Sequence, residues 1–396
     1  MRIAFFSFSI APFAPNDLLY YRAAGMALEK GHDVLVSAFD WGEQNAPEYR
    51  DIAKRGALLQ FRRRDIRHKN FFLRQLKKAQ HKISDPIKQL EFIERFAPDV
   101  AVISDSATYH FIGEPTFPEY ILSKGIPAVT ISQYNDETYS LPNDHFDLAR
   151  KFFSAASSCV FVSQRNLDKA RIQLCLPLDN GVVLDNPPNL TELDQERFPR
   201  TEEAAMAMVA RLDCVVKGQS VVLEVLAQEQ WRARKWKLNL YGKGPDERYL
   251  RELIRYLDLQ DRVFLCGHVG NIREVWAENE ILLMCSAGEG KPLALTEAMV
   301  CGRPAVVTDV GGNAELIEDG VTGFVAESAA SGSFAKALER AWEQRRCWEE
   351  MGARAHANIR ARLATPPESQ LLSVIESSKS PRKKFGVPSG RLKTES

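Results

Sequence analysis

The chain has 396 residues, of which 45% are hydrophobic and 26% are charged, and its formal net charge at pH 7 is zero. This length is too great for one hydrophobic core and favours two domains. The composition excludes a disordered chain, and no apolar run approaches the ~18 residues of a membrane span. Seven cysteines without a C-x-x-C pair indicate free thiols in a reducing compartment, so we expect a cytoplasmic protein without a structural metal.

The amino-terminal half alternates short apolar runs with helical patterns, which predicts a doubly wound parallel sheet over residues 1–188. Residues 1–14 also imitate a signal peptide, but serines interrupt their short apolar core. The helical pattern at 18–30 and the apolar run at 34–36 complete a βαβ unit that needs residues 3–8 as its first strand. Further strands are expected near Leu58 and at 100–104, 128–132, 160–163 and 182–184.

Residues 54–88 carry twelve Lys or Arg against Asp65 and Asp85, although the whole chain is neutral. Phe72 and Leu76 fall at helical spacing among these cations, which is typical of an amphipathic helix on anionic lipid. The region therefore predicts peripheral contact with the inner face of the cell membrane, with a solvated helix packed on its own sheet as the alternative. We expect no nucleic-acid binding, because no recognition motif or interleaved aromatic residues accompany the cations.

The carboxyl-terminal half repeats the alternation. A polar, proline-bearing stretch at 185–199 indicates a linker, with the domain boundary between residues 188 and 189. A second doubly wound domain is expected at 189–350, since apolar runs at 204–210, 237–241, 263–266, 281–285, 305–308 and 323–326 predict its strands. Residues 351–376 are helical in pattern, and the basic stretch at 377–396 lacks periodicity, which predicts a disordered tail.

Residues 281–308 are the most informative segment, because they combine a strand, a glycine loop, a helix, a glycine stop and a second strand. Gly288 and Gly290 leave the backbone unobstructed beside the strand end. Pro292 stands where a first helical residue tolerates a missing N–H. A helix that starts there directs free N–H groups and a partial positive charge into the cleft, which suits a phosphate.

Two glutamates accompany this turn. Glu289 lies in the loop, and Glu297 lies eight positions later in the helix. A carboxylate beside a bound diphosphate can accept hydrogen bonds from sugar hydroxyls, and one inside the helix can hold a ribose diol. Such pairs are also common on solvated helices, but Glu297 stands in an apolar run where an unpaired carboxylate is costly. We therefore expect Glu297 to have a polar partner.

Glu289 and Glu297 match the E-x7-E motif of the retaining family 4 glycosyltransferases of GT-B fold. The match continues through residues 308–315 and 320–324, and further blocks appear upstream in the family's order at 209–212, 217–218 and 241–245. It is strong over about residues 200–350 and weaker before them. The chain thus resembles this family, and its strand-end loops at 132–135 and 161–166 resemble a bacterial branch with undefined acceptors.

The resemblance implies two Rossmann-like doubly wound domains facing across a cleft, with residues 351–376 forming a helix that returns to the first domain. It implies a retaining hexosyltransferase of cell-envelope polysaccharide biosynthesis, which moves a sugar from a UDP- or GDP-linked donor to a saccharide, lipid-linked or other acceptor hydroxyl. No cofactor or metal is expected. The sequence contains no D-x-D triplet, and Arg211 and Lys217 would stabilise the departing diphosphate instead of magnesium.

The resemblance also assigns site residues. The predicted catalytic residues are Arg211, Lys217 and Glu289. The predicted donor-binding residues are Gly242, Gly244, Gly267, Val269, Gly288, Gly290, Lys291, Pro292, Leu293 and Glu297. Candidates on the acceptor side, which the first domain should supply, are Asn16, Asp17, Asp105 and His110. Each of these four can equally serve the protein's own hydrogen bonds.

This chain departs from its relatives on the acceptor side. Many relatives carry a Gly-Gly or Gly-Ser pair after the first strand and a histidine at the end of the strand corresponding to residues 100–104. Neither is present here, since Ser104, Asp105 and Ser106 stand at that strand end. The acceptor side therefore stays unassigned by the sequence.

Two other classes of protein remain open. A sugar-nucleotide epimerase can share the same fold, and a sugar-nucleotide binder without activity would need only part of the site. The joint presence of Arg211, Lys217 and Glu289 favours a transferase over a binder. A glycoside hydrolase with two carboxylates fits less well, because both glutamates stand beside a predicted phosphate site.

Overall fold

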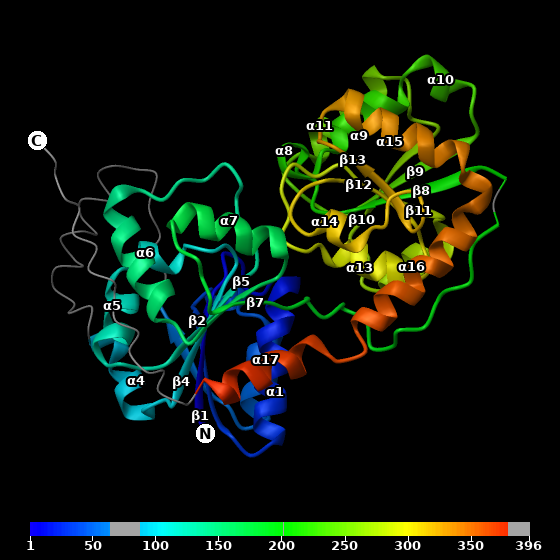
Figure 1. Ribbon diagram of the computed structural model, residues 1–396. Helices are drawn as coiled ribbons and strands as arrows, with labels where there is room; N and C mark the ends of the chain where they lie inside the picture. The colour runs from blue at the N-terminus through cyan, green and yellow to red at the C-terminus, as the bar shows by residue number, and fades with distance from the viewer. Residues whose placement is uncertain (64–87, 201, 379–396) are drawn as a thin grey trace, which may run out of the picture.

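The computed structural model describes residues 1–63, 88–200 and 202–378, which form two α/β domains (Figure 1). The first sheet has seven parallel strands in the order β3-β2-β1-β4-β5-β6-β7, and the second has six in the order β10-β9-β8-β11-β12-β13. In both sheets the chain starts near the centre and moves outward in two directions, so both are doubly wound as predicted. The predicted basic helix around Phe72 and the predicted tail beyond residue 378 lie outside the described residues.

The strands of the first domain are buried on both faces, as expected of a parallel sheet covered by helices. In β1, every residue after Arg2 is buried. The strands are β1 (Arg2–Phe8), β2 (Asp33–Phe39), β3 (Leu58–Arg62), β4 (Val100–Asp105), β5 (Ala128–Ser132), β6 (Ser158–Phe161) and β7 (Gly181–Val183). The described α-helices are α1 (Leu18–Glu29), α2 (Pro47–Lys54), α4 (Glu91–Phe96), α5 (Thr116–Ser123), α6 (Asn143–Ala155) and α7 (Gln164–Leu174).

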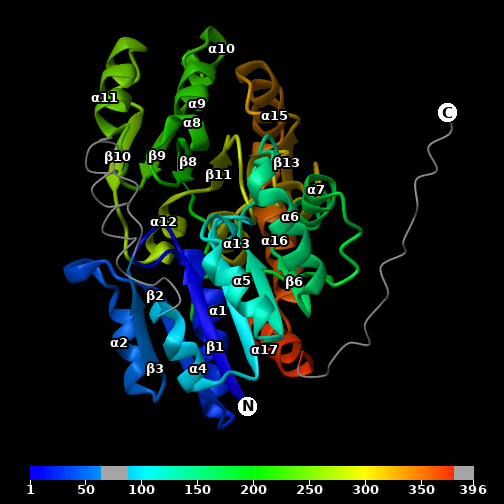
Figure 2. The ribbon, with the colours of Figure 1, turned by 90° about the vertical axis from the view of Figure 1, so that its left-hand side faces the viewer.

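The second domain has the same layered plan, with an apolar core on each face of its sheet. Its strands are β8 (Ala204–Val209), β9 (Trp236–Tyr241), β10 (Val263–Gly267), β11 (Ile281–Met284), β12 (Ala305–Thr308) and β13 (Gly323–Ala326). Its helices are α8 (Cys214–Lys217), α9 (Gln219–Leu226), α10 (Glu229–Arg232), α11 (Glu247–Tyr256), α12 (Ile272–Glu278), α13 (Leu293–Val300), α14 (Asn313–Leu316) and α15 (Ser331–Glu343). In Figure 2, α12 and α13 lie between the second sheet and the first domain.

The chain crosses between the domains twice. The first crossing, residues 184–203, joins β7 to β8 and contains the predicted boundary at 188/189. The second, residues 363–366, joins α16 (Trp348–Arg362) to α17 (Pro367–Ser377). Within the described residues, no helix is long and apolar enough to cross a membrane.

The segment expected to form one returning helix at 351–376 is divided between α16 and α17. Pro366 and Pro367 explain the division, because a proline ring cannot continue a preceding helix. The first of these helices stays with the second domain, where it packs on α13. Only α17 reaches the first domain, where it lies against α1 (Figure 1) with Leu371, Leu372 and Ile375 fully buried.

This docking predicts a measurable stability effect. We expect Leu372→Ala to lower the free energy of unfolding by about 2–5 kcal/mol, because it removes a fully buried side chain from a packed core. Denaturant unfolding followed by circular dichroism measures the change. Ser373→Ala on the exposed side of the same helix is the matched control and should stay within about 0.5 kcal/mol of the wild type. Equal effects of the two substitutions would contradict the docking of α17.

Candidate functional site

The glycine loop, residues 286–292, joins β11 to α13 and lies directly against the first domain. A Cβ atom added to Gly290 would stand 1.8 Å from the carbonyl oxygen of Gln133. One added to Gly288 would stand 2.7 Å from the hydroxyl of Tyr134. The sequence analysis expected these glycines to leave room for a ligand, but on this side the space is occupied by the loop that follows β5.

Lys217 and Glu289 form the central ion pair of the site. Lys217 Nζ lies 2.6 Å from Glu289 Oε1, and the glutamate side chain is only 9% exposed. Lys217 is the last residue of α8 and precedes Gly218, whose φ is 67° and whose added Cβ would meet the Cys285 carbonyl at 2.1 Å. Only glycine therefore allows α8 to end this close to β11. Two predicted catalytic residues that are 72 positions apart thus meet.

Arg211 lies in the turn between β8 and α8. Its side chain is 63% exposed and forms an ion pair with Asp213. Asp213 also caps α8, because its carboxylate accepts a hydrogen bond from the Val216 N–H. The structure therefore places Arg211 after the carboxyl end of β8, as predicted, but joins it to Asp213 and not to Glu289.

Glu297 lies on the buried face of α13, against the first interdomain crossing. Its Oε1 accepts a hydrogen bond of 3.1 Å from the backbone N–H of Asn189, which supplies the polar partner that its apolar surroundings require. Burial raises the pKa of Glu297 to about 7, and the bond from Asn189 offsets part of that rise. The carboxyl group therefore changes its charge near neutral pH.

The other predicted donor-binding glycines permit close backbone approaches. Gly242 has φ 138°, and its added Cβ would stand 2.0 Å from the Ala210 carbonyl oxygen. The added Cβ of Gly244 would stand 2.2 Å from the Leu212 carbonyl oxygen. The turns after β8 and β9 are therefore pressed together beside Arg211. Gly267 has φ 72°, and a Cβ added there would meet no atom within 4 Å. Val269 and Leu293 are half-buried. Pro292 is buried and is the N-cap of α13, whereas the sequence analysis expected it to be the first helical residue.

Asp105 and His110 form a pair at the end of β4. The Asp105 side chain is 2% exposed and accepts hydrogen bonds from the N–H groups of Ala107 and Phe111 at 3.0 and 3.2 Å. His110 Nδ1 lies 3.3 Å from Asp105 Oδ1, and this contact raises the pKa of the half-exposed histidine. The carboxylate thus serves the protein's own hydrogen bonds, while His110 is the member of the pair that solvent or a ligand can reach.

Asp17 and Asn16 also form internal contacts. Asp17 is 3% exposed and accepts the Ala14 N–H at 2.7 Å, and burial raises the pKa of its carboxyl group to about 6. The backbone oxygen of Asn16 accepts a hydrogen bond of 3.0 Å from Gln133 Nε2. Of these two candidates, only the half-buried side chain of Asn16 is available to a ligand.

Gln133 is a site residue that the sequence analysis did not single out. Its Nε2 donates to the Asn16 carbonyl, and its Oε1 accepts a 2.8 Å hydrogen bond from Asn186 Nδ2 in the first crossing. Its own carbonyl is the atom against which Gly290 packs. A polar residue directly after the apolar run at 128–132 was the available signal. Gln133 joins its own loop after β5 to the loop before α1, the first crossing and the glycine loop, and this role depends on tertiary contacts.

Arg165 is a second residue that sequence reasoning missed. It stands in the first turn of α7 and bonds Asp309 of the second domain at 2.8 Å. Its guanidinium also holds Glu137 of its own domain, and its backbone N–H donates to Glu315 Oε1 at 3.0 Å. The loop after β12 is therefore bound to the first domain by charge-assisted hydrogen bonds.

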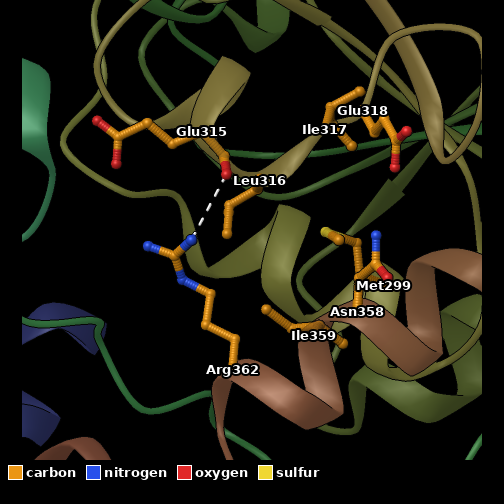
Figure 3. Close-up of a pocket in the computed structure, with 8 residues that line it drawn as sticks. All are labelled: Met299, Glu315, Leu316, Ile317, Glu318, Asn358, Ile359 and Arg362. Atoms are coloured by element: carbon orange, nitrogen blue, oxygen red, sulfur yellow. Dashed lines mark hydrogen bonds between the residues drawn. The ribbon is translucent and has the colours of Figure 1, made fainter.

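A cavity of about 320 Å³ lies between α13, α14 and α16 (Figure 3). Met299, Leu316 and Ile359 are among its apolar lining residues. Arg362 enters it from α16 and points its guanidinium toward the backbone oxygen of Glu315. None of the predicted catalytic residues lines this cavity, so it is separate from the Lys217–Glu289 pair.

Two doubly wound domains whose strand-end loops meet at the glycine loop have the GT-B fold of glycosyltransferases. Residues 203–344 match the family model of glycosyl transferases group 1. The second domain is therefore similar to the group 1 glycosyl transferases over these residues, and the resemblance found in the sequence is confirmed. The finer assignment to family 4 stays a prediction.

Two bacterial relatives are similar over parts of the chain. An N-acetyl-alpha-D-glucosaminyl L-malate synthase of Bacillus anthracis is 33% identical over 123 residues, which cover 31% of this chain and 32% of that protein. An alpha-D-kanosaminyltransferase of Streptomyces kanamyceticus is 26% identical over 267 residues, which cover 61% of this chain and 69% of that protein. The chain thus matches about a third of the length of the first relative and about two thirds of the second.

Solved structures resemble the whole described fold. The HepE protein of Anabaena, solved in complex with UDP, has a TM-score of 0.71 at 19% identity and covers 96% of this chain and 100% of its own. A glycosyltransferase of Rickettsia africae has a TM-score of 0.71 at 16% identity, covering 95% and 98%. At these identities the similarity shows the two-domain fold.

Proposed function

We propose that the protein is a retaining, metal-independent glycosyltransferase that moves a sugar from a nucleoside-diphosphate sugar to an acceptor hydroxyl. The observation that carries the proposal is the ion pair between half-buried Lys217 and buried Glu289 beside the start of α13. A helix start with a nearby cation suits a diphosphate, and a carboxylate next to it suits the hydroxyls of the attached sugar. The acceptor is a saccharide or lipid-linked saccharide of the cell envelope. The protein acts in the cytoplasm, in peripheral contact with the inner face of the cell membrane.

In this proposal each residue has one task. Lys217 and Arg211 stabilise the negative charge that develops on the departing diphosphate, which lowers the barrier because that charge is greatest in the transition state. Glu289 binds a hydroxyl of the transferred sugar, and Glu297 binds the ribose diol. The acceptor attacks from the face that the diphosphate leaves, and the leaving phosphate takes the acceptor's proton. His110, which is half-exposed at the end of β4, contacts the acceptor.

A ligand panel tests the proposal. UDP, GDP, ADP and their glucose derivatives are added to the full chain, and thermal unfolding is recorded. A ligand present at a hundred times its Kd should stabilise the protein by about 2.7 kcal/mol. UDP and UDP-glucose come first, because HepE was solved with each of them. If no nucleotide raises the unfolding temperature at millimolar concentration, the proposed function is wrong.

The epimerase alternative is separated by a second measurement. The sugar nucleotide that binds is incubated with the protein and without acceptor, and its anomeric proton signals are followed by NMR. A transferase leaves the sugar configuration unchanged, apart from slow hydrolysis. The appearance of a second sugar nucleotide would favour an epimerase.

The raised pKa of Glu297 gives a pH prediction for donor binding. A ribose diol donates hydrogen bonds, so the ionised carboxylate is the better acceptor, and donor affinity should fall as the pH drops through the pKa of about 7. Between about pH 8 and about pH 6 the ionised fraction falls roughly tenfold, and affinity should follow it. Calorimetry with UDP-glucose measures the donor affinity at each pH. This ligand is suitable because its diphosphate stays fully ionised in that range, so the ligand itself adds no pH dependence. Glu297→Gln should flatten the profile, and an unchanged slope would contradict the ribose assignment.

A further inference from the structure

Lys291 is a buried cation between two carboxylates of the protein. It stands two residues after Glu289, and its side chain is 1% exposed. Its Nζ lies 2.5 Å from Asp185 Oδ1 and 3.5 Å from Glu315 Oε2. A buried ammonium group requires such partners, since an uncompensated charge in a protein interior is costly. The sequence analysis placed Lys291 among the donor contacts. In the structure its ammonium group instead forms ion pairs with two carboxylates of the protein.

Asp185 connects Lys291 to both crossings between the domains. It stands at the beginning of the first crossing, immediately after Leu184, which follows β7. Its second carboxylate oxygen accepts a hydrogen bond of 2.6 Å from Arg362 Nε. Arg362 is the last residue of α16, where the second crossing begins. One carboxylate therefore joins the glycine loop to the two segments that determine how the domains are placed.

The second partner of Lys291 also reaches the first domain. Glu315 Oε1 accepts the backbone N–H of Arg165 at 3.0 Å, while its Oε2 faces Lys291. The aliphatic part of the lysine is confined as well, because a Cβ added to Gly312 would stand 3.0 Å from Lys291 Cε. The ammonium group is thus held between a residue of the crossing and a residue bonded to α7.

We propose that Lys291 is a positioning residue that ties the glycine loop to both interdomain crossings and thereby sets Glu289 and α13 for sugar transfer. The transfer itself rests on the function proposed above. Glu289 is separated from Lys291 by Gly290 alone, so a change in the position of the lysine backbone moves the glutamate. Displacement of a reacting group by about 1 Å can lower a rate about a hundredfold, which makes this anchor important although it touches no substrate.

The test compares Lys291→Met, which keeps the length of the side chain and removes its charge, with Asp185→Asn and with the double variant. Each single substitution should lower kcat by about tenfold to a hundredfold and change the Kd for UDP by less than about threefold. The double variant should be no slower than the slower single variant, because both remove the same interaction. Lys291→Arg should recover part of kcat. Lys336→Met, the same substitution at an exposed site on α15, is the control.

Small-angle X-ray scattering supplies a readout that needs no substrate. The radius of gyration of Lys291→Met and Asp185→Asn should exceed that of the wild type and of Lys336→Met. If Lys291→Met does not fold, Asp185→Asn carries the test, because its amide can still bond Arg362. A tenfold rise in the Kd for UDP with unchanged kcat would overturn the proposal in favour of a donor contact. Wild-type kcat and scattering in both variants would also overturn it.

The two proposals fail in different ways. If the wild type neither binds UDP or the other nucleotides of the panel nor transfers a sugar, the proposed function fails, while the scattering comparison still decides whether Lys291 ties the domains. If the wild type transfers a sugar and the Lys291 variants keep its kcat, the function stands and the positioning role is wrong.

Discussion

Lys217→Met is expected to lower kcat for sugar transfer by about 10²–10³-fold, which is the usual effect of removing one fixed group that stabilises transition-state charge. The ammonium group lies 2.6 Å from Glu289 at the end of α8, so its position is set before a donor arrives. In the proposed reaction it faces a diphosphate that carries more negative charge in the transition state than in the bound donor. The loss should therefore fall on kcat more than on donor affinity.

The measurement is steady-state release of nucleoside diphosphate together with calorimetry on the intact donor. Lys336→Met makes the same chemical change at an exposed position and should leave both quantities unaltered. If Lys217→Met weakens donor binding and kcat/KM by the same factor with kcat unchanged, the lysine contributes uniform binding and has no special role in the transition state.

The second large effect is expected at Gly290. Gly290→Ala introduces a Cβ atom that would stand 1.8 Å from the Gln133 carbonyl oxygen and 3.2 Å from Val162 Cγ2. Neither neighbour is the flexible end of a side chain that can turn away, so the glycine loop and the first domain must separate. A shift of about 1 Å between reacting groups can cost about 10²-fold in rate, and we expect a loss of at least that size.

Nucleotide binding separates this effect from unfolding. Gly290→Ala should bind UDP within about threefold of the wild type, because the proposed contacts to the nucleotide come from the second domain. Gly332→Ala in α15 is the matched control, since an added Cβ there meets no atom within 4 Å. Transfer by Gly290→Ala at the wild-type rate would show that the contact between Gly290 and Gln133 is absent during the reaction.

The strands and turns of the second domain could be predicted because their signals are local. Apolar runs of strand length, Gly218 and Gly290 at close backbone contacts, and Pro292 at the start of α13 each leave a mark within a few positions of the sequence. Lys217 and Glu289 each follow a predicted strand, but the sequence did not show that they meet. The structure confirms the two doubly wound sheets and brings this pair into contact.

Other outcomes depend on long-range contacts. The pattern at 351–376 indicated one helix, and the division between α16 and α17 follows from Pro366 and from the different domains on which the two helices pack. Lys291 carried the motif's local signature of a ligand contact, yet its partner Asp185 is 106 positions away. Nothing in the sequence around either residue records that pairing.

The sequence by itself determined the two doubly wound sheets, because they depend on the periodicity of apolar runs and on glycine or proline at particular turns. Only the tertiary structure decided that Gln133 fills the space beside Gly290, that Asp105 serves backbone N–H groups while His110 stays accessible, and that Lys291 belongs to the interdomain crossings. The physical reason is that a charged or polar group takes whichever partner folding brings to it. That partner is set by the packing of whole domains.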